Sequence, residues 1–280
     1  PKMTESSLNS RIPGFYNLSL DERHARLVQC GLLESEDVPV LEGGAGLSLE
    51  QAQHMIENVI GVFSLPLGLA LNFVVNGQEV IVPMAVEEPS IVAGASFMAK
   101  LARAGGGFRA QTTPPEMIGQ LQVLDLDDLQ SAKYAILGEK SALLAELEDI
   151  DPVLKRLGGG PRDLEVRLID DSPIGPFLVL HLIYDVRDAM GANAINTACE
   201  RLAPRIEALT GGHVHLRILS NLADRRLAKA TCTIPLPALA FADFSSEDVR
   251  DGIISAWAFA KVDPYRAATH NKGIMNAIDA

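Results

Sequence analysis

The chain has 280 residues, 48% of them hydrophobic, which supplies a sizeable core for one large domain or two ordinary ones. A formal net charge of -12 at pH 7 argues against binding to nucleic acids or anionic membranes, because those partners demand clustered lysine and arginine. The cysteines Cys30, Cys199 and Cys232 are widely separated, so neither a disulfide framework nor a structural zinc site is indicated, and a reducing, cytoplasmic compartment is expected.

The N-terminal part of the chain predicts a helix, a hairpin and a second helix. Residues 1–11 are polar and the most apolar run, 59–75, is interrupted by proline and glycine, so neither a signal peptide nor a membrane span is expected. Ser19 and Glu22 form a capping-box pattern, and the asparagine-glycine pair at 76–77 is typical of a hairpin turn. The predicted elements are a helix at residues 20–31, strands at 69–75 and 79–85, and a helix at 91–104.

Residues 111–115 are polar and turn-rich, and the pattern of predicted strands and helices changes after them. We therefore place a domain boundary there. The predicted elements of the unit that follows are a strand at 121–126, a helix at 127–147, strands at 164–169 and 177–186, a helix at 189–209 and a strand at 214–219. The order βαββαβ, with a turn at 172–176, is typical of the split-βαβ or ferredoxin-like arrangement. A strand at 228–234 and a helix at 245–262 then return the chain to the first domain.

The predicted fold class is therefore α+β, with a discontinuous large α/β domain and an inserted ferredoxin-like domain. The large domain comprises residues 1–114 and 223–280, and the inserted domain comprises residues 115–222. The Rossmann fingerprint G-x-G-x-x-G after a strand is missing from the sequence. The fragment at residues 44–46 follows no strand and lacks the third small residue, so it is interpreted as a loop.

Residues 188–193 are the better candidate for contact with a dinucleotide, because there an apolar strand passes directly into a helix. Backbone N–H groups at a helix N-terminus bind pyrophosphate, and small residues let a ligand approach the backbone closely. A second interpretation stays open from the residues alone, namely a tight strand-to-helix turn in which Asp188 is only the N-cap.

Charged residues at three further places are candidates for chemistry. Glu87 and Glu88 are adjacent and directly precede a helix. Either one of them donates a proton in catalysis, or both only interact favourably with the helix dipole. Lys272, in an otherwise uncharged segment, is either a desolvated cation that faces a developing oxyanion or an ordinary surface lysine. Arg266, which we expect just before the helix that carries Lys272, either clamps a substrate carboxylate or pairs with Asp263.

Two histidines on one strand are candidates for metal ligands. His213 and His215 alternate and therefore share a face, as a ligand pair would. Because no third ligand is near them in the sequence, we expect two solvated histidines and no metal site.

Five segments, in the same order, resemble the signatures of 3-hydroxy-3-methylglutaryl-coenzyme A (HMG-CoA) reductases. They are residues 57–61 (ENVIG), 83–90 (PMAVEEPS), 185–193 (DVRDAMGAN), 218–224 (ILSNLAD) and 263–273 (DPYRAATHNKG). The likeness runs from about residue 11 to the last residue, and the lysine in the fifth segment resembles that of class II enzymes. The resemblance implies an NAD(P)-dependent oxidoreductase that links HMG-CoA to mevalonate and CoA by two hydride transfers.

The resemblance also implies roles for individual residues. Glu88 is implied as the catalytic acid and Lys272 as the cation that stabilises the thioester carbonyl oxygen, while Ser90, Arg266 and Asn276 match positions at the substrate end. The residues that match the cofactor side are Asp151, Asp188, Met190, Gly191, Asn193 and Asn221. Asp151 matches an acidic position that would favour a ribose 2′-hydroxyl over a 2′-phosphate, so NAD is expected rather than NADP.

The family's sites lie between subunits, and residues 57–61 resemble an interface motif, so a homodimer or a larger assembly of dimers is expected. Oxidation of mevalonate with NAD is the expected direction; the alternatives are a biosynthetic, NADPH-dependent reductase and a non-catalytic fragment that binds CoA or nucleotide. The family also uses an aspartate after the Lys272 helix and a flap histidine, and neither Asp279 nor His270 matches these. We therefore expect the 280 residues to be a piece of a longer chain, with little or no turnover alone.

Overall fold

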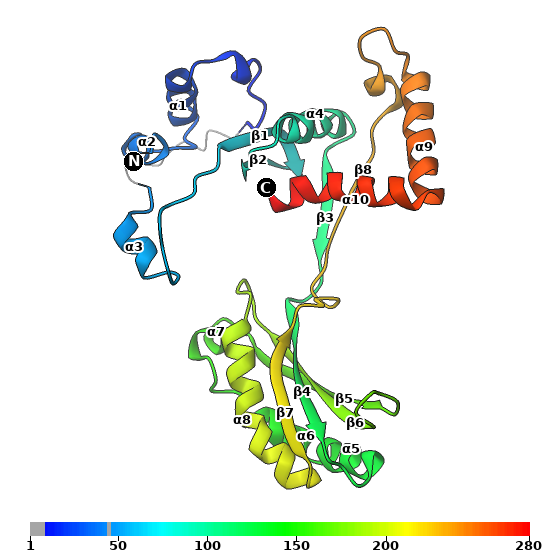
Figure 1. Ribbon diagram of the computed structural model, residues 1–280. Helices are drawn as coiled ribbons and strands as arrows, with labels where there is room; N and C mark the ends of the chain where they lie inside the picture. The colour runs from blue at the N-terminus through cyan, green and yellow to red at the C-terminus, as the bar shows by residue number, and fades with distance from the viewer. Residues whose placement is uncertain (1–8, 44–45) are drawn as a thin grey trace. The chain divides into compact units, whose positions relative to one another are not determined.

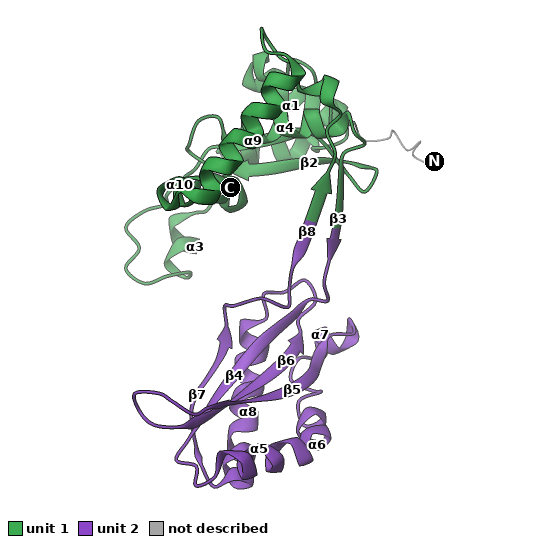
Figure 2. Ribbon diagram, turned by 90° about the vertical axis from the view of Figure 1, so that its right-hand side faces the viewer, with its two compact units in different colours: residues 1–110, 230–280 green, residues 111–229 purple. Residues whose placement is uncertain are grey.

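The computed structural model describes residues 9–43 and 46–280 (Figure 1). Most of the polar N-terminal stretch, and two residues of the glycine fragment at 44–46, lie outside the described residues. The chain divides into two compact units, the first from Pro1–Ala110 with Ala230–Ala280 and the second from Gln111–Lys229 (Figure 2). Among the described residues, no helix combines the length and the apolar content needed to cross a membrane.

The first unit is built on a sheet of strand order β2-β1-β3-β8. Its strands are β1 (Leu67–Val75), β2 (Gln78–Ala85), β3 (Phe108–Thr112) and β8 (Ala228–Cys232), of which β3 and β8 carry the chain to and from the second unit. Its α-helices are α1 (Leu20–Gln29), α2 (Val38–Leu41), α3 (Leu49–Gln53), α4 (Ile91–Arg103), α9 (Ser246–Val262) and α10 (Pro264–Asp279). Short 3-10 turns occur at Phe15–Asn17, Ser35–Asp37 and Leu236–Leu239.

The expected hairpin is confirmed. Val75 lies opposite Gln78, and both turn residues have positive φ, 51° at Asn76 and 81° at Gly77, as a tight hairpin turn requires. The capping box is also confirmed, because the Glu22 backbone N–H donates to the side chain of Ser19 and its carboxylate accepts from the Ser19 backbone. Local hydrogen bonds alone specify both features, so the sequence was sufficient to predict them.

The second unit is a four-stranded antiparallel sheet of order β5-β6-β4-β7, with helices on one face (Figure 2). Its strands are β4 (Glu116–Leu124), β5 (Gly160–Ile169), β6 (Phe177–Asp185) and β7 (His213–Ser220). Its helices are α5 (Leu129–Gly138), α6 (Lys140–Ala145), α7 (Pro152–Arg156) and α8 (Ala192–Thr210). One cluster of buried apolar side chains, drawn from all four strands and all four helices, forms its core.

Several predicted boundaries in this unit were wrong. The helix expected at 127–147 is two helices that meet at Gly138 and Glu139, and β4 begins at Glu116 rather than at 121. The short helix α7 was not predicted, and α8 begins at Ala192 instead of 189. Residue patterns alone did not locate these boundaries.

Candidate functional site

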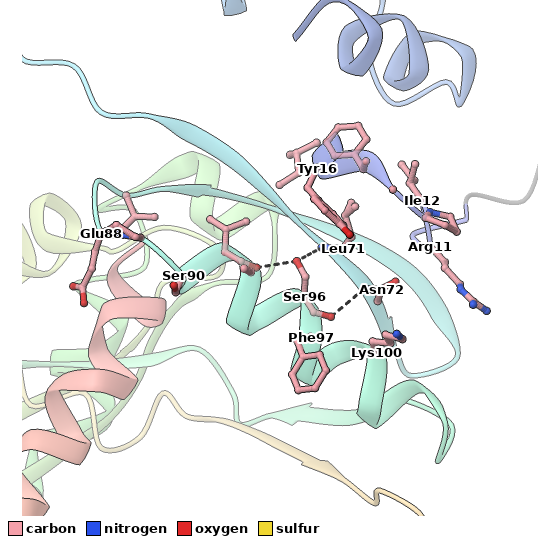
Figure 3. Close-up of a pocket in the computed structure, with 18 residues that line it drawn as sticks. Arg11, Ile12, Tyr16, Leu71, Asn72, Glu88, Ser90, Ser96, Phe97 and Lys100 are labelled. Atoms are coloured by element: carbon pink, nitrogen blue, oxygen red, sulfur yellow. Dashed lines mark hydrogen bonds between the residues drawn. The ribbon is translucent and has the colours of Figure 1, made fainter. Parts of the chain in front are cut away.

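A cavity of about 750 Å³ in the first unit is lined by β1, α4 and the loop that follows β2. Glu88 and Ser90 lie toward one end of the labelled side chains, and Arg11 and Lys100 lie toward the other (Figure 3). Ser90 is the N-cap of α4 with φ 73°, a left-handed conformation that is costly for a residue with a Cβ. The cavity is therefore elongated, with a carboxylate and a hydroxyl toward one end and two basic side chains toward the other.

The helix α4 is fixed on β1 by the side chain of Ser96. Its hydroxyl donates to the Val92 carbonyl at 2.8 Å and accepts the Leu71 backbone N–H at 3.0 Å. The side-chain amide of Asn72 donates to the Ser96 carbonyl at 3.0 Å (Figure 3). The bonds to Leu71 and from Asn72 join α4 to β1, and they fix the relative position of these two elements of the cavity wall.

Glu88 and Lys272, which are 184 positions apart, meet in the first unit. The Lys272 ammonium Nζ donates to Glu88 Oε2 at 3.2 Å. Their side chains are 45% and 68% exposed, so of the two interpretations of Lys272 this structure shows the exposed lysine rather than the desolvated one. An exposed ion pair adds at most about 1 kcal/mol to stability, so the contact between Glu88 and Lys272 contributes little to the stability of the fold.

Lys272 and the two other singled-out residues of its segment lie on α10. Arg266 is inside this helix, not before it, and Asp263 is the N-cap that accepts the backbone N–H of Arg266 at 2.7 Å. The suggested pairing with Asp263 thus involves the backbone rather than the guanidinium. Lys272 and Asn276 are four residues apart and share a face of the helix. Within the described residues, neither of these side chains nor Arg266 lines the cavity, whereas Glu88 and Ser90 do.

The basic end of the cavity was not singled out from the sequence. Neither Lys100 nor Arg11 was named there as a candidate. In the structure, the preceding residue Ser10 is completely buried and donates through its backbone N–H to Glu79 Oε2 at 2.9 Å. Arg103 donates to both oxygens of Glu79, at 2.8 and 2.5 Å, which lowers the pKa of that carboxyl to about 2. This network places Arg11 at the cavity.

The candidate cofactor residues gather at one end of the second sheet. Ile118 of β4 lies opposite Ile183 of β6 and opposite Ser220 of β7, so β6 and β7 are parallel to each other and end together. Asp188 and the turn around it follow β6, and Asn221 directly follows β7. Gly160, at the start of β5, lies opposite Asp185, so the loop after α7 reaches the same end. The sheet register therefore brings these separate segments together.

The turn between β6 and α8 corrects one interpretation of Asp188. The N-cap of α8 is Gly191, with φ 89° and no side-chain hydrogen bond to the helix end, so Asp188 is not the cap. Asp188 and Met190 are exposed, as is Asn193 in the first turn of the helix. A Cβ at position 191 would lie 2.3 Å from the side chain of Val186, so only glycine fits. The first N–H groups of a 19-residue helix are thus left without a side-chain cap.

Asp151 caps α7. Its Oδ1 accepts the backbone N–H groups of Val153 and Leu154, both at 2.9 Å. The side chain thus has a structural role that the sequence did not reveal, although Asp-x-x before a helix is a recognisable N-cap pattern.

The two histidines of β7 lie on the surface of the second unit. The His213 ring nitrogen Nδ1 is 3.0 Å from Glu207 Oε1, and the rings of His213 and His215 are 6.4 Å apart. In residues 9–43 and 46–280, no group of three or more His, Cys, Asp or Glu side chains is arranged to hold a metal ion.

Comparison with known proteins identifies relatives along nearly the whole chain. The sequence profile of hydroxymethylglutaryl-coenzyme A reductase matches residues 19–280. The 3-hydroxy-3-methylglutaryl-coenzyme A reductase of Archaeoglobus fulgidus is 49% identical over 98% of this chain, and a probable reductase of Borreliella burgdorferi is 33% identical over 80% of it. The chain spans 61% and 51% of the lengths of these two relatives.

Solved structures agree with the sequence comparison. The 3-hydroxy-3-methylglutaryl-coenzyme A reductase of Streptococcus pneumoniae superposes with a TM-score of 0.89 at 40% identity, over 96% of this chain and 72% of that one. Another structure of the enzyme from this organism is described as class II and bound to NADPH in open conformations. The mixed α+β fold with two sheets matches these structures, and the chain belongs to the hydroxymethylglutaryl-coenzyme A reductase family.

Proposed function

We propose that the protein interconverts HMG-CoA with mevalonate and CoA by two successive hydride transfers, with NAD as its cofactor and mevalonate oxidation as its direction. The observation that carries this proposal is the cavity with Glu88 and Ser90 toward one end, Lys272 bonded to Glu88, and Arg11 with Lys100 toward the other end. An acyl-CoA has the matching polarity, because its thioester is remote from its phosphates. The three free cysteines and the family assignment both favour a cytoplasmic protein.

The chemistry at the acyl end follows from two side chains that point at one place. Glu88 donates a proton to the aldehyde oxygen during reduction. In the oxidation direction it accepts the proton from the corresponding hydroxyl. Lys272, 3.2 Å from Glu88, places its ammonium where negative charge develops on the carbonyl oxygen. Ser90, Arg266 and Asn276 orient the hydroxymethylglutaryl group. Because Glu88 and Lys272 are solvent-exposed in this structure, their electrostatic effect is screened. We therefore expect little or no steady-state turnover from this chain alone, while a single hydride transfer should still be detectable.

Residues 115–222, which lie within the second unit, are proposed as a ferredoxin-like nucleotide-binding domain inserted into a large domain of residues 1–114 and 223–280. The uncapped N-terminus of α8 fits a pyrophosphate, since among the described residues no side chain caps its first N–H groups. The other cofactor contacts are proposed for Asp151, Asp188, Met190, Gly191, Asn193 and Asn221. When bound, the nicotinamide ring supplies or accepts the hydride.

Asp151 supports NAD over NADP, because a carboxylate repels a 2′-phosphate. The NADPH bound to the Streptococcus pneumoniae enzyme favours the alternative, a biosynthetic NADPH-dependent reductase. Calorimetric titration with NADH and NADPH separates the two. If NADPH binds more tightly, the NAD assignment is wrong while the family reaction stands.

A homodimer, or a larger assembly of dimers, is proposed from the exposed apolar side chains of the first unit. Ile60 and Phe63, in and beside the segment 57–61, are 102% and 87% exposed. Apolar surface of this extent is typical of protein interfaces. Sedimentation of the purified chain tests the proposal.

Calorimetry with two ligands tests the cavity assignment. Lys100→Ala removes a charge at the phosphate end, so CoA and HMG-CoA should both bind about fivefold more weakly. Ser90→Ala acts at the acyl end and should weaken HMG-CoA but not CoA. Lys261→Ala, an exposed lysine of α9, is the matched control and should change neither. If the unmodified chain binds neither HMG-CoA nor a nicotinamide dinucleotide, the proposed function is wrong.

A single-turnover assay with NADH separates the reductase from a non-catalytic fragment that only binds CoA or nucleotide. Any hydride transfer should fall about 100-fold or more in Glu88→Gln and in Lys272→Ala, with HMG-CoA still bound. Binding with no detectable transfer in the unmodified chain favours the fragment.

A further inference from the structure

A buried carboxylate lies directly behind the turn that joins β6 to α8. Asp185, the last residue of β6, is only 4% exposed. Its Oδ2 accepts from Nη2 of Arg187 at 2.8 Å and from Nη2 of Arg162 at 2.9 Å. Its Oδ1 accepts the backbone N–H of Arg187 at 3.0 Å. A buried carboxylate is stable only when it is paired and hydrogen-bonded, so these three bonds act together.

The same two arginines also reach the loop after α7. Arg187 Nη2 donates to the Gly158 carbonyl at 2.6 Å, and Arg162 Nη2 donates to the same oxygen. The loop lies close against the strand end, because a Cβ at Gly159 would be 2.8 Å from the Asp185 carbonyl oxygen. One carboxylate therefore connects the α7 segment, which Asp151 caps, with the turn that carries Asp188.

The outer side of the turn is held by a third arginine. Arg226 Nη1 donates to the Ala189 carbonyl at 2.6 Å, and its Nη2 donates to the Arg187 carbonyl at 3.1 Å. Arg187 itself has φ 52°, a left-handed conformation that is unfavourable without such support. The turn is thus fixed from both sides, with two of its carbonyl oxygens bonded to a cation.

We infer that Asp185 is a positioning residue for the dinucleotide: with Arg162 and Arg187 it sets the spacing between the Asp151 segment and the turn at residues 188–191. The inference rests on the proposed function, in which these two segments hold the two halves of one cofactor. Asp185 need not touch the ligand. Its effect depends on the ligand's length, because only a dinucleotide must reach both segments at once.

Binding of a long and a short ligand to Asp185→Asn tests this inference. The variant keeps the shape of the side chain but loses its charge, so NADH should bind about tenfold more weakly. AMP needs only the Asp151 segment and should change by less than about twofold. Asp170→Asn, an exposed aspartate of the same unit, is the matched control and should leave both ligands unaffected.

Arg162→Lys is a milder second variant, because it keeps the positive charge but loses the planar group that bonds two acceptors. It should weaken NADH by about threefold and leave AMP unchanged, and it decides the question if Asp185→Asn does not fold. Equal losses for NADH and AMP, or no loss for NADH in a folded variant, would overturn the positioning role. Failure of the unmodified chain to bind NADH or NADPH would instead overturn the proposed function, and the inference with it.

Discussion

The two units differ in how they hold their helices. In the second unit, Leu121, Ile136 and Leu202 are completely buried within one continuous core. In the first unit, α9 and α10 have no buried residue at all, and Trp257 and Tyr265 are 62% and 85% exposed. The second unit buries its own apolar side chains, whereas the first presents many of them to solvent. The difference supports the proposal that the first unit associates with a second copy, and it predicts that the second unit depends mainly on its own core for stability.

Truncation of an apolar side chain should therefore cost much more in the second unit. Leu182→Ala removes a completely buried side chain and should lower the free energy of unfolding by about 3 kcal/mol. Ile254→Ala, at an exposed position of α9, should change it by less than about 0.5 kcal/mol in the monomer. Urea denaturation at low protein concentration measures both, and equal losses would contradict the comparison.

The first unit should instead depend on polar networks such as Glu79 with Arg103. Glu79→Gln should lower its stability at pH 7 by about 2 kcal/mol, because the ion pair and the bonds to Ser10 are weakened. The folded pKa, about 2, is below the ordinary 4.5, so the contribution is complete above pH 4.5 and is lost as the pH falls toward 2. Acid unfolding should be less pH-dependent in the variant over that window.

The exposed Glu34→Gln is the control for this network. It removes a carboxylate of the same unit that takes part in no such pairing in the described structure. If both variants show the same acid unfolding curve, Glu79 does not stabilise the unit through its charge.

Truncation of an exposed apolar side chain of α9 should weaken self-association, although it should hardly change the free energy of unfolding of the monomer. Trp257→Ser removes the largest exposed apolar side chain of the helix, so the dissociation constant of the proposed dimer should rise about tenfold, or about 1.4 kcal/mol. Sedimentation equilibrium measures this constant. Tyr134→Ser in α5, 69% exposed in the second unit, is the matched control and should leave it unchanged.

The smallest expected effect concerns the capping box at the N-terminus of α9. The Ser245 hydroxyl accepts the backbone N–H of Asp248 at 3.1 Å in a capping box, so Ser245→Ala should cost about 1 kcal/mol. Ser255→Ala, in the exposed interior of the same helix, should be neutral or slightly stabilising because alanine has the higher helix propensity. Opposite signs in circular dichroism melts are expected, and a shared sign would refute the local origin of the effect.

The candidate site was predictable in part. The resemblance named Glu88 and Lys272, but the 3.2 Å contact between them depends on how α10 packs in the first unit. Lys100, Asp185 and Arg226 were missed, because in a sequence a charged residue that lines a cavity or is paired inside the fold looks the same as one on the surface. Asp188 was weighed as an N-cap, but the steric fit of Gly191 against Val186 moves the helix start.

By itself, the sequence determined the features that depend on near neighbours: the hairpin turn at Asn76 and Gly77, the capping box at Ser19, and the apolar periodicity of the second unit. Only the tertiary structure decided where helices break and which distant charges meet. The physical reason is range: a turn or a cap is completed by atoms within four residues, whereas a cavity or a buried ion pair requires side chains that the fold brings together.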